Sequence, residues 1–300
     1  MNRLIVIVGP TASGKSALAM RLALRFGCEI ISGDSMCVYR GMDIGTAKPS
    51  QEERQQIPHH LIDIREPGED FSVADFQQLA GEAVKSINQR GKIPILVGGT
   101  GLYVQALLEG YKFSSTPKTE LRDSLTENAT HESLAIMDPK TAARIHPNDR
   151  KRILRALEVA TSEQRPISCD KTSNNPTLLF DCIVFGLSVE RQELYRRINA
   201  RVDKMLEAGL MNEVRLLTNR GLSDESTALQ AIGYKEIAAH LQGLVPLADA
   251  IDHVKQSSRR YAKRQLTWFR RMPYIQWIEQ DEDEAFNFME RQVAEKFVIK

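Results

Sequence analysis

The sequence predicts an α/β fold, in which a parallel sheet of the P-loop NTPase type carries an inserted helical subdomain and a helical C-terminal part. Three observations predict it. Continuous apolar runs of strand length alternate with segments whose apolar residues have helical spacing, and a glycine-rich segment follows the first run. Between residues 112 and 177 the sequence becomes polar. We therefore expect a P-loop core over residues 1–111 and 178–300, interrupted by the insert at 112–177.

The first strand is expected at residues 3–8, because the run RLIVIV suits a strand buried on both faces of a parallel sheet. Helical spacing of apolar residues predicts a helix over residues 16–25. Residues 29–32 and 93–97 have the composition of further buried strands, and so do residues 180–187.

The insert is bracketed by FSSTPKTE and SEQRPISCDKTSNNPT, which are rich in turn formers. Helices are expected from residue 188 onward, including RINARVDKMLEAGL and a basic helix over residues 255–272. At 100° per residue, that last helix has an apolar stripe and an opposite basic face. The stripe comprises Tyr261, Ala262, Leu266, Trp268, Phe269 and Met272, and the basic face comprises Arg259, Arg260, Lys263, Arg264, Arg270 and Arg271.

Composition excludes several classes of protein. The chain has 300 residues, 42% hydrophobic and 26% charged, and no apolar run reaches the roughly 18 residues of a membrane helix, so we expect a cytoplasmic protein. The four cysteines and six histidines lack the spacing of zinc ligands. Because the net charge is only +1, any nucleic-acid surface must be a local patch.

The strongest motif is GPTASGKS at residues 9–16, which fits the P-loop pattern GxxxxGK[ST] between a strand and a helix. In this motif backbone N–H groups and the helix N-terminus bind phosphate oxygens. Lys15 adds a positive charge, and Ser16 can hold Mg²⁺. The motif is typical of nucleotide- and ATP-binding proteins, but it does not identify the phosphorylated ligand.

Asp34 follows the second expected strand, where ligands of open α/β sheets bind. On position alone, its carboxylate could hold Mg²⁺, act as a general base or cap a turn. The strand PILVG ends in glycines and Thr100, without the acidic residue that hydrolytic P-loop proteins carry. The sequence therefore argues against motor and switch ATPases.

The chain resembles the tRNA dimethylallyltransferases, also called tRNA isopentenyltransferases, of the bacterial type. Matching segments run in order from about residue 5 to about residue 275: GPTASGKS, DSMCVYRGMDIGTAKP, PHHLIDI, FSVADF, PILVGGTGLYVQALLEG, RIHPNDRKRILRALEV, RINARVDKML, IGYKE and KRQLTWFR. The resemblance implies transfer of a dimethylallyl group from dimethylallyl diphosphate to N6 of the adenosine 3′-adjacent to the anticodon, with Mg²⁺ and release of diphosphate.

The resemblance also implies residue roles. Asp34 would be the general base, Thr100 a contact to the adenine and Lys15 a stabiliser of the leaving group. The implied diphosphate-binding residues are Gly9, Pro10, Thr11, Ala12, Ser13, Gly14, Lys15, Ser16 and Arg201, with Mg²⁺ held partly by Ser16 and partly by the diphosphate.

Contacts to the tRNA anticodon stem-loop are expected in four segments. They comprise Asp34, Ser35, Met36, Cys37, Thr100 and Arg122; Lys151, Arg152, Ile153, Leu154 and Arg155; Gln230, Gly233, Tyr234 and Lys235; and Arg260, Lys263 and Arg264. Many members carry Gln or an aliphatic residue at the position of Cys37, so only a contact is implied there. The residues 260–264 are added because neighbouring like charges on a helix repel unless a polyanion relieves them.

Three alternatives stay open from the residues. A small-molecule P-loop kinase would use ATP, with Asp34 deprotonating a hydroxyl. An adenylate isopentenyltransferase would use free AMP as the acceptor. A non-enzymatic RNA-binding protein would have a degenerate site, against which the intact Lys15, Ser16 and Asp34 argue. We expect a monomer.

Overall fold

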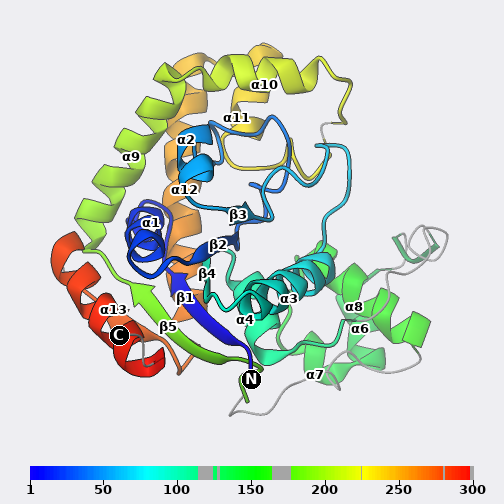
Figure 1. The fold of residues 1–300 in the computed structure, drawn as a ribbon. Coiled ribbons are helices and arrows are strands. Elements are labelled where there is room, and N and C mark those ends of the chain that lie inside the picture. The colour runs from blue at the N-terminus through cyan, green and yellow to red at the C-terminus, as the bar shows by residue number, and fades with distance from the viewer. Residues whose placement is uncertain (114–123, 127–128, 164–176, 224, 280, 298–300) are drawn as a thin grey trace. The chain divides into compact units, whose positions relative to one another are not determined.

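The computed structural model describes residues 1–300 except 114–123, 127–128, 164–176, 224, 280 and 298–300 (Figure 1). The chain divides into two compact units. One consists of Met1–Leu108 together with Leu178–Lys300, and the other is Glu109–Thr177. No helix in the described part of the chain is long and apolar enough to cross a membrane.

The first unit is built on a six-stranded sheet in which every pairing is parallel, with strand order β3-β2-β4-β1-β5-β6. Its strands are β1 (Arg3–Val8), β2 (Glu29–Ser32), β3 (His59–His60), β4 (Pro94–Gly98), β5 (Asp181–Leu187) and β6 (Gln276–Ile278). The predicted α/β fold class is confirmed. Because β1, β2 and β4 are neighbours, the loops that follow them meet at one edge of the sheet.

Helices cover both faces of this sheet (Figure 1). On one face α1 (Lys15–Phe26) and α13 (Glu282–Phe297) pack against Ile5, Ile95 and Phe185. The opposite face, with Leu4, Val6 and Leu96, contributes to a core shared with the other large helices. These are α3 (Val73–Gln89), α4 (Gly101–Glu109), α9 (Arg191–Glu207), α10 (Leu210–Thr218), α11 (Tyr234–Leu241) and α12 (Leu247–Phe269).

Local sequence explains where several helices begin. Ser50 starts α2 (Gln51–Gln56), and Ser72 starts α3, each with a capping box that satisfies two backbone N–H groups. Three acidic residues occupy the first turn of α13, where the helix dipole favours negative charge, and Asp283 there bonds Arg21 of α1 at 2.8 Å.

Two sequence expectations about the C-terminal helices were wrong. The expected single helix over RINARVDKMLEAGL ends at Glu207, because Gly209 takes a left-handed φ of 102° and α10 begins after it. The basic helix begins at Leu247 instead of 255 and ends at Phe269, so Met272 lies beyond it.

The second unit has its own small core. Its described helices are α6 (His131–Met137), α7 (Pro139–Ala142) and α8 (Arg150–Glu163). Leu134, Ile153 and Leu157 are buried together at its centre. The Asp149 carboxylate accepts a hydrogen bond from the Arg152 N–H at 3.3 Å, as expected of a residue that caps α8.

Candidate active site

The loop between β1 and α1 has the backbone of a phosphate cradle. Ala12 and Gly14 adopt left-handed φ values of 62° and 88°, so the loop wraps tightly before α1 begins at Lys15. The Lys15 Nζ donates to the Pro10 carbonyl at 3.1 Å and thereby folds back over the loop. The buried Ser13 hydroxyl has no hydrogen-bond partner among the described residues, which leaves it available to a ligand.

Polar groups from the ends of β2 and β4 lie beside this loop. The Asp34 carboxylate accepts from the Met36 N–H at 2.8 Å, which fixes its orientation. The Thr100 hydroxyl accepts from the Ser35 N–H at 3.3 Å and so joins the two loops. The observed strand order thus brings Asp34 and Thr100 to the edge of the sheet that carries the cradle.

A pocket of about 210 Å³ opens among these loops, α1 and α9. Its polar lining includes Thr11, Lys15, Ser16, Ser32, Asp34, Cys37, Thr46, Lys48, Arg201, Tyr261 and Gln265. Its apolar lining includes Ala19, Met20, Ile30, Ile62 and Val97. The mixture fits a ligand with a charged head and a small hydrocarbon part.

Two cations of the pocket, Lys15 and Arg201, have lowered pKa values. Burial and the nearby Arg201 guanidinium lower the pKa of Lys15 to about 8, although Asp34 opposes the shift. Burial likewise holds the pKa of Arg201 below its usual value. Within the described part of the chain neither cation forms an ion pair with a carboxylate, and Arg201 donates only to the Thr46 carbonyl at 3.3 Å. An anion in this pocket would relieve the desolvation of both cations.

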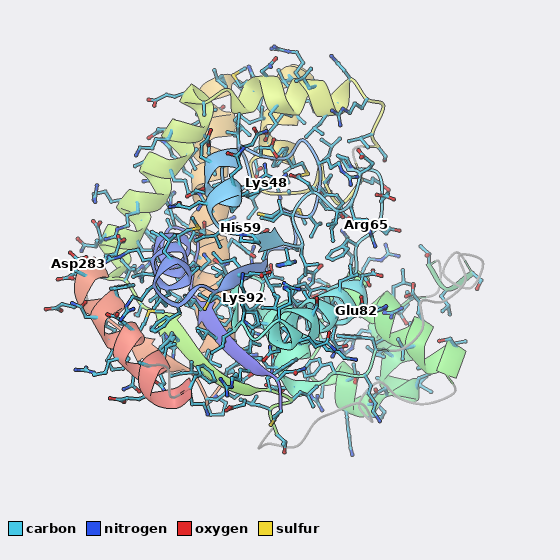
Figure 2. The ribbon with its side chains drawn as sticks, viewed as in Figure 1. Lys48, His59, Arg65, Glu82, Lys92 and Asp283 are labelled. Atoms are coloured by element: carbon cyan, nitrogen blue, oxygen red, sulfur yellow. The ribbon has the colours of Figure 1, made fainter. Side chains whose placement is uncertain are left out.

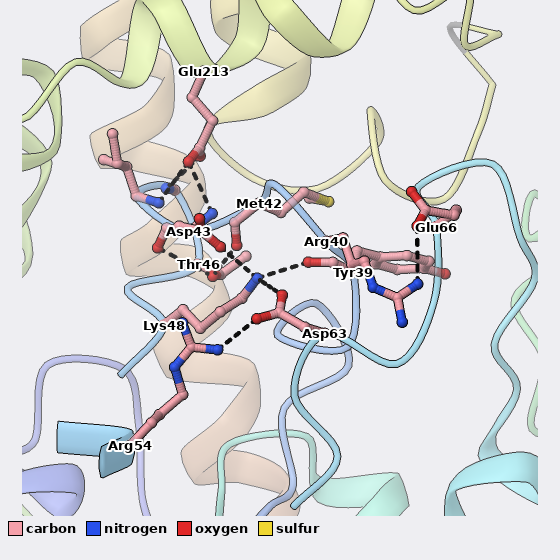
Figure 3. Close-up of polar contacts among 12 residues, drawn as sticks. Tyr39, Arg40, Met42, Asp43, Thr46, Lys48, Arg54, Asp63, Glu66 and Glu213 are labelled. Carbon is pink, nitrogen blue, oxygen red and sulfur yellow. Dashed lines mark hydrogen bonds and ion pairs between the residues drawn. The ribbon is translucent and has the colours of Figure 1, made fainter. Parts of the chain in front are cut away.

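The segment that follows Asp34 is held in place by Lys48 (Figure 3). The Lys48 side chain is only 1% exposed, and its ammonium donates to the Tyr39 carbonyl at 2.7 Å and to Asp43 and Asp63 at 2.6 Å each. Arg54 binds the other oxygen of Asp63 at 2.6 Å. Burial would raise the pKa of Asp63, but hydrogen bonds from Lys48 and Arg54 outweigh it and hold the pKa below its ordinary value.

The outer side of the same segment is fastened by Glu213 of α10. Its carboxylate accepts from the N–H groups of Asp43 and Ile44 at 2.8 Å and of Gly45 at 3.0 Å. The Tyr234 hydroxyl donates to the same carboxylate at 2.6 Å. The Thr46 carbonyl that receives Arg201 therefore comes from a segment held on both sides.

The structure brings part of the predicted diphosphate set into the pocket. Thr11, Lys15, Ser16 and Arg201 line it, whereas Gly9, Pro10, Ala12, Ser13 and Gly14 shape the loop behind them. Among the described residues no group of three His, Cys, Asp or Glu could hold a metal ion. Lys48 and His59, labelled in Figure 2, also line the pocket and were not predicted as site residues.

The predicted tRNA contacts are placed unevenly. Arg260, Lys263 and Arg264 are exposed on α12, as expected, and Gln230 and Lys235 are exposed near α11. Gly233 caps the start of α11, and Tyr234 is fully buried, so this tyrosine supports Glu213 instead of facing solvent. Arg259 was expected on the basic face but is half-buried and donates to Asn199 at 2.7 Å.

Near the pocket, Ser35 and Met36 are half-buried and Cys37 is buried. In the second unit Lys151 and Arg152 are exposed, Leu154 and Arg155 are half-buried, and Ile153 belongs to the core. Arg122 lies outside the described residues.

Sequence reasoning missed Tyr261 and Gln265 as members of the site. Tyr261 was placed on the apolar stripe of α12, yet it lines the pocket together with Asp34. Gln265 is a buried polar residue on the same helix. A glutamine inside an otherwise apolar stripe was the available signal, because a buried amide requires hydrogen-bond partners.

Comparison with known proteins gives one consistent family. The family model described as IPP transferase matches residues 37–272. A tRNA dimethylallyltransferase of Geobacillus thermodenitrificans is 50% identical over 293 residues, covering 95% of this chain and 93% of that protein. Another, of Anoxybacillus flavithermus, is 48% identical over 298 residues, covering 98% and 94%.

Solved structures agree with these relatives. A tRNA isopentenylpyrophosphate transferase of Bacillus halodurans superposes with a TM-score of 0.75 at 44% identity, covering 99% of this chain and 97% of that one. A eukaryotic dimethylallyltransferase, described as acting on tRNA, superposes with a TM-score of 0.84 at 31% identity, covering 98% and 78%.

Proposed function

This chain belongs to the IPP transferase family, and we propose that it transfers the dimethylallyl group of dimethylallyl diphosphate to N6 of the adenosine 3′-adjacent to the anticodon in tRNA. Diphosphate is the second product. The proposal is supported by the relatives, which are named tRNA dimethylallyltransferases, and by the solved eukaryotic relative described as acting on tRNA.

One observation of this structure carries the proposal. Lys15 and Arg201 are two desolvated cations in one pocket, without a carboxylate partner among the described residues, and Asp34 lines the same pocket. The two cations suit a diphosphate leaving group. The reaction needs a base only to take a proton from the acceptor, and Asp34 can supply it. The apolar lining from α1 and β2 is suited to a short hydrocarbon chain.

The reaction follows from these positions. The bond between the allylic carbon C1 and the diphosphate oxygen breaks, and a bond between C1 and the adenine N6 forms. Lys15, Arg201 and the N–H groups at the start of α1 stabilise the charge that grows on the departing oxygens. Asp34 takes the N6 proton as general base, and Thr100 contacts the adenine.

Mg²⁺ fits this site as a partner of the diphosphate more than of the protein. Ser16 is exposed at the first turn of α1 and lines the pocket, and the described residues offer no cluster of metal ligands. The ion would be held by the Ser16 hydroxyl and by diphosphate oxygens, as is usual for Mg²⁺ at phosphates. When bound, it would neutralise charge on the leaving group.

The exposed basic face of α12, defined here as Arg260, Lys263, Arg264, Arg270 and Arg271, would bind the tRNA backbone. The same role is proposed for the exposed Lys151 and Arg152 of the second unit. An adenine must leave its stack before a carboxylate can reach N6, so the acceptor would enter as a flipped base.

The test is incubation of the purified protein with undermodified tRNA, dimethylallyl diphosphate and Mg²⁺, followed by mass spectrometry of the nucleosides. We expect adenosine carrying a dimethylallyl group at the position 3′ of the anticodon. Parallel reactions replace tRNA by AMP, or the donor by ATP with small hydroxyl acceptors. Prenylated AMP without prenylated tRNA would favour an adenylate isopentenyltransferase, and a phosphorylated acceptor would favour a kinase.

A further inference from the structure

Helix α12 connects two loops of the site through one buried side chain, Gln265, which is 5% exposed. Its amide oxygen accepts from the Thr11 N–H of the phosphate cradle at 2.9 Å. Its amide nitrogen donates to the Gly99 carbonyl, next to Thr100, at 2.9 Å. One planar group thus joins the loop after β1 to the loop after β4.

The approach at Gly99 leaves no room for a side chain. A Cβ built on Gly99 would lie 2.2 Å from the Gln265 amide nitrogen. The glycine therefore allows the helix to come close enough for the amide to reach both loops. Any larger residue at position 99 would displace the Gln265 amide from its hydrogen bond.

Tyr261, one turn earlier on α12, lines the same pocket as Gln265 and Asp34. Burial, together with the Asp34 charge, raises the pKa of Tyr261 to about 12, so the hydroxyl stays protonated at neutral pH. Thr100 in turn receives the Ser35 N–H.

These contacts form a continuous path from the phosphate cradle to the base. It runs from Thr11 through Gln265 to Gly99, and from the adjacent Thr100 to Ser35 in the loop that carries Asp34. We propose that Gln265 is a positioning residue that, with Tyr261, fixes the distance and angle between the donor's leaving-group site and the acceptor's base. The inference rests on the proposed transfer reaction, in which the leaving-group site and the base must act on the two bonds of one transfer at the same time.

The expected size of the effect follows from the demands of such a reaction. A misplacement of about 1 Å between reacting groups can lower a rate about 100-fold, although each substrate is still bound by its own loop. Loss of Gln265 should therefore lower the rate of the chemical step by about 10- to 100-fold. The dissociation constants of donor and tRNA, each measured alone, should change by less than about threefold, because Lys15, Arg201 and the basic face of α12, which are proposed to bind the two substrates, are unchanged.

Two variants separate positioning from folding. Gln265→Met keeps the length of the side chain and removes both hydrogen bonds. Gln265→Glu keeps the acceptor for Thr11, and when protonated it can also donate to Gly99. Its carboxyl is buried, which raises its pKa, so the rate relative to wild type at each pH should recover as pH falls. Division by the wild-type rate removes every pH effect that the two proteins share.

Gln77 on α3 supplies a matched control. Its amide nitrogen donates to the Ala106 carbonyl at 2.7 Å, and neither residue lines the pocket. Gln77→Met and Gln77→Glu should leave the single-turnover rate within about twofold of wild type, as expected for sites that do not touch the reaction. Thermal unfolding of all variants identifies any that are not folded at the assay temperature.

A readout without turnover completes the design. In wild-type protein the amide hydrogens of Gly9 and of residues 11–14 should exchange slowly, and Gln265→Met should speed the exchange while Gln77→Met should not. Equal single-turnover rates of Gln265→Met and wild type would overturn the inference, and so would a Gln265→Glu variant with no recovery at low pH. A wild-type protein that forms no prenylated adenosine would instead reject the proposed function. In that case the exchange data alone would decide whether Gln265 holds the cradle.

Discussion

The replacement Lys48→Met removes a buried ammonium that has three acceptors and is 1% exposed. Breaking a buried ion pair by removing one partner costs about 3–5 kcal/mol. Asp43 is 58% exposed and can be hydrated, and Asp63 keeps its bond to Arg54. We therefore expect the free energy of unfolding to fall by the lower figure, about 3 kcal/mol.

Urea unfolding followed by circular dichroism measures this loss. The matched control is Lys92→Met, because Lys92 is 47% exposed and its partner Glu29 keeps Arg90 and His60. Because the Lys92 ammonium is half-exposed and the buried Glu29 keeps two other partners, we expect this variant to lose about 1 kcal/mol or less. Equal losses in the two variants, or a loss below about 1 kcal/mol for Lys48→Met, would refute the claim that Lys48 holds the segment after Asp34.

Folded Lys48→Met should also bind the donor more weakly, since the Thr46 carbonyl that receives Arg201 belongs to the loosened segment. Equilibrium binding of inorganic diphosphate measures this without turnover. Affinity equal to that of Lys92→Met would show that Arg201 does not depend on the segment.

Three further predictions concern the pocket and the basic face. Asp34→Asn should lower the chemical step about 10²- to 10⁴-fold in single-turnover assays while tRNA affinity stays within a few-fold, and a wild-type rate would reject Asp34 as the base. Donor affinity should be constant below the Lys15 pKa of about 8 and should weaken as pH rises through it, because the bound anion needs the protonated amine; titration calorimetry of Lys15→Arg should lack this dependence. Charge reversal at Arg260 and Arg264 should weaken tRNA binding and flatten its salt dependence but leave donor affinity unchanged; an unchanged slope of log affinity against log salt would contradict an RNA contact there.

The sequence predicted the parts of the site whose residues lie close together in the chain. The cradle needs glycine, lysine and serine at fixed spacing, so GPTASGKS located it, and strand order brought Asp34 and Thr100 beside it. The motif is a local signal that needs no knowledge of the tertiary structure, whereas the strand order is known only from the structure.

The remaining site residues depend on contacts that no local pattern encodes. Gln265 meets Thr11 across 254 positions of sequence, and helical periodicity says only that residue 265 faces inward. In the sequence Lys48 cannot be told from a surface lysine; only the structure shows that its ammonium is bonded to Asp63 and to the Tyr39 carbonyl. Tyr234 lies in a segment that resembles a tRNA contact, yet its ring fills the space above Gly45, where a Cβ would lie 2.5 Å from it.

The central claim is that the cradle holds a leaving group and that a carbon, not a phosphoryl group, moves to the acceptor. Donor labelled with oxygen-18 at the atom between C1 and phosphorus tests it in one reaction with tRNA and Mg²⁺. Prenyl transfer breaks the bond from C1 to that oxygen, so we predict that all of the label appears in the released diphosphate, in a one-to-one ratio with prenylated adenosine. Label retained in dimethylallyl alcohol would mean cleavage at phosphorus and would contradict the account.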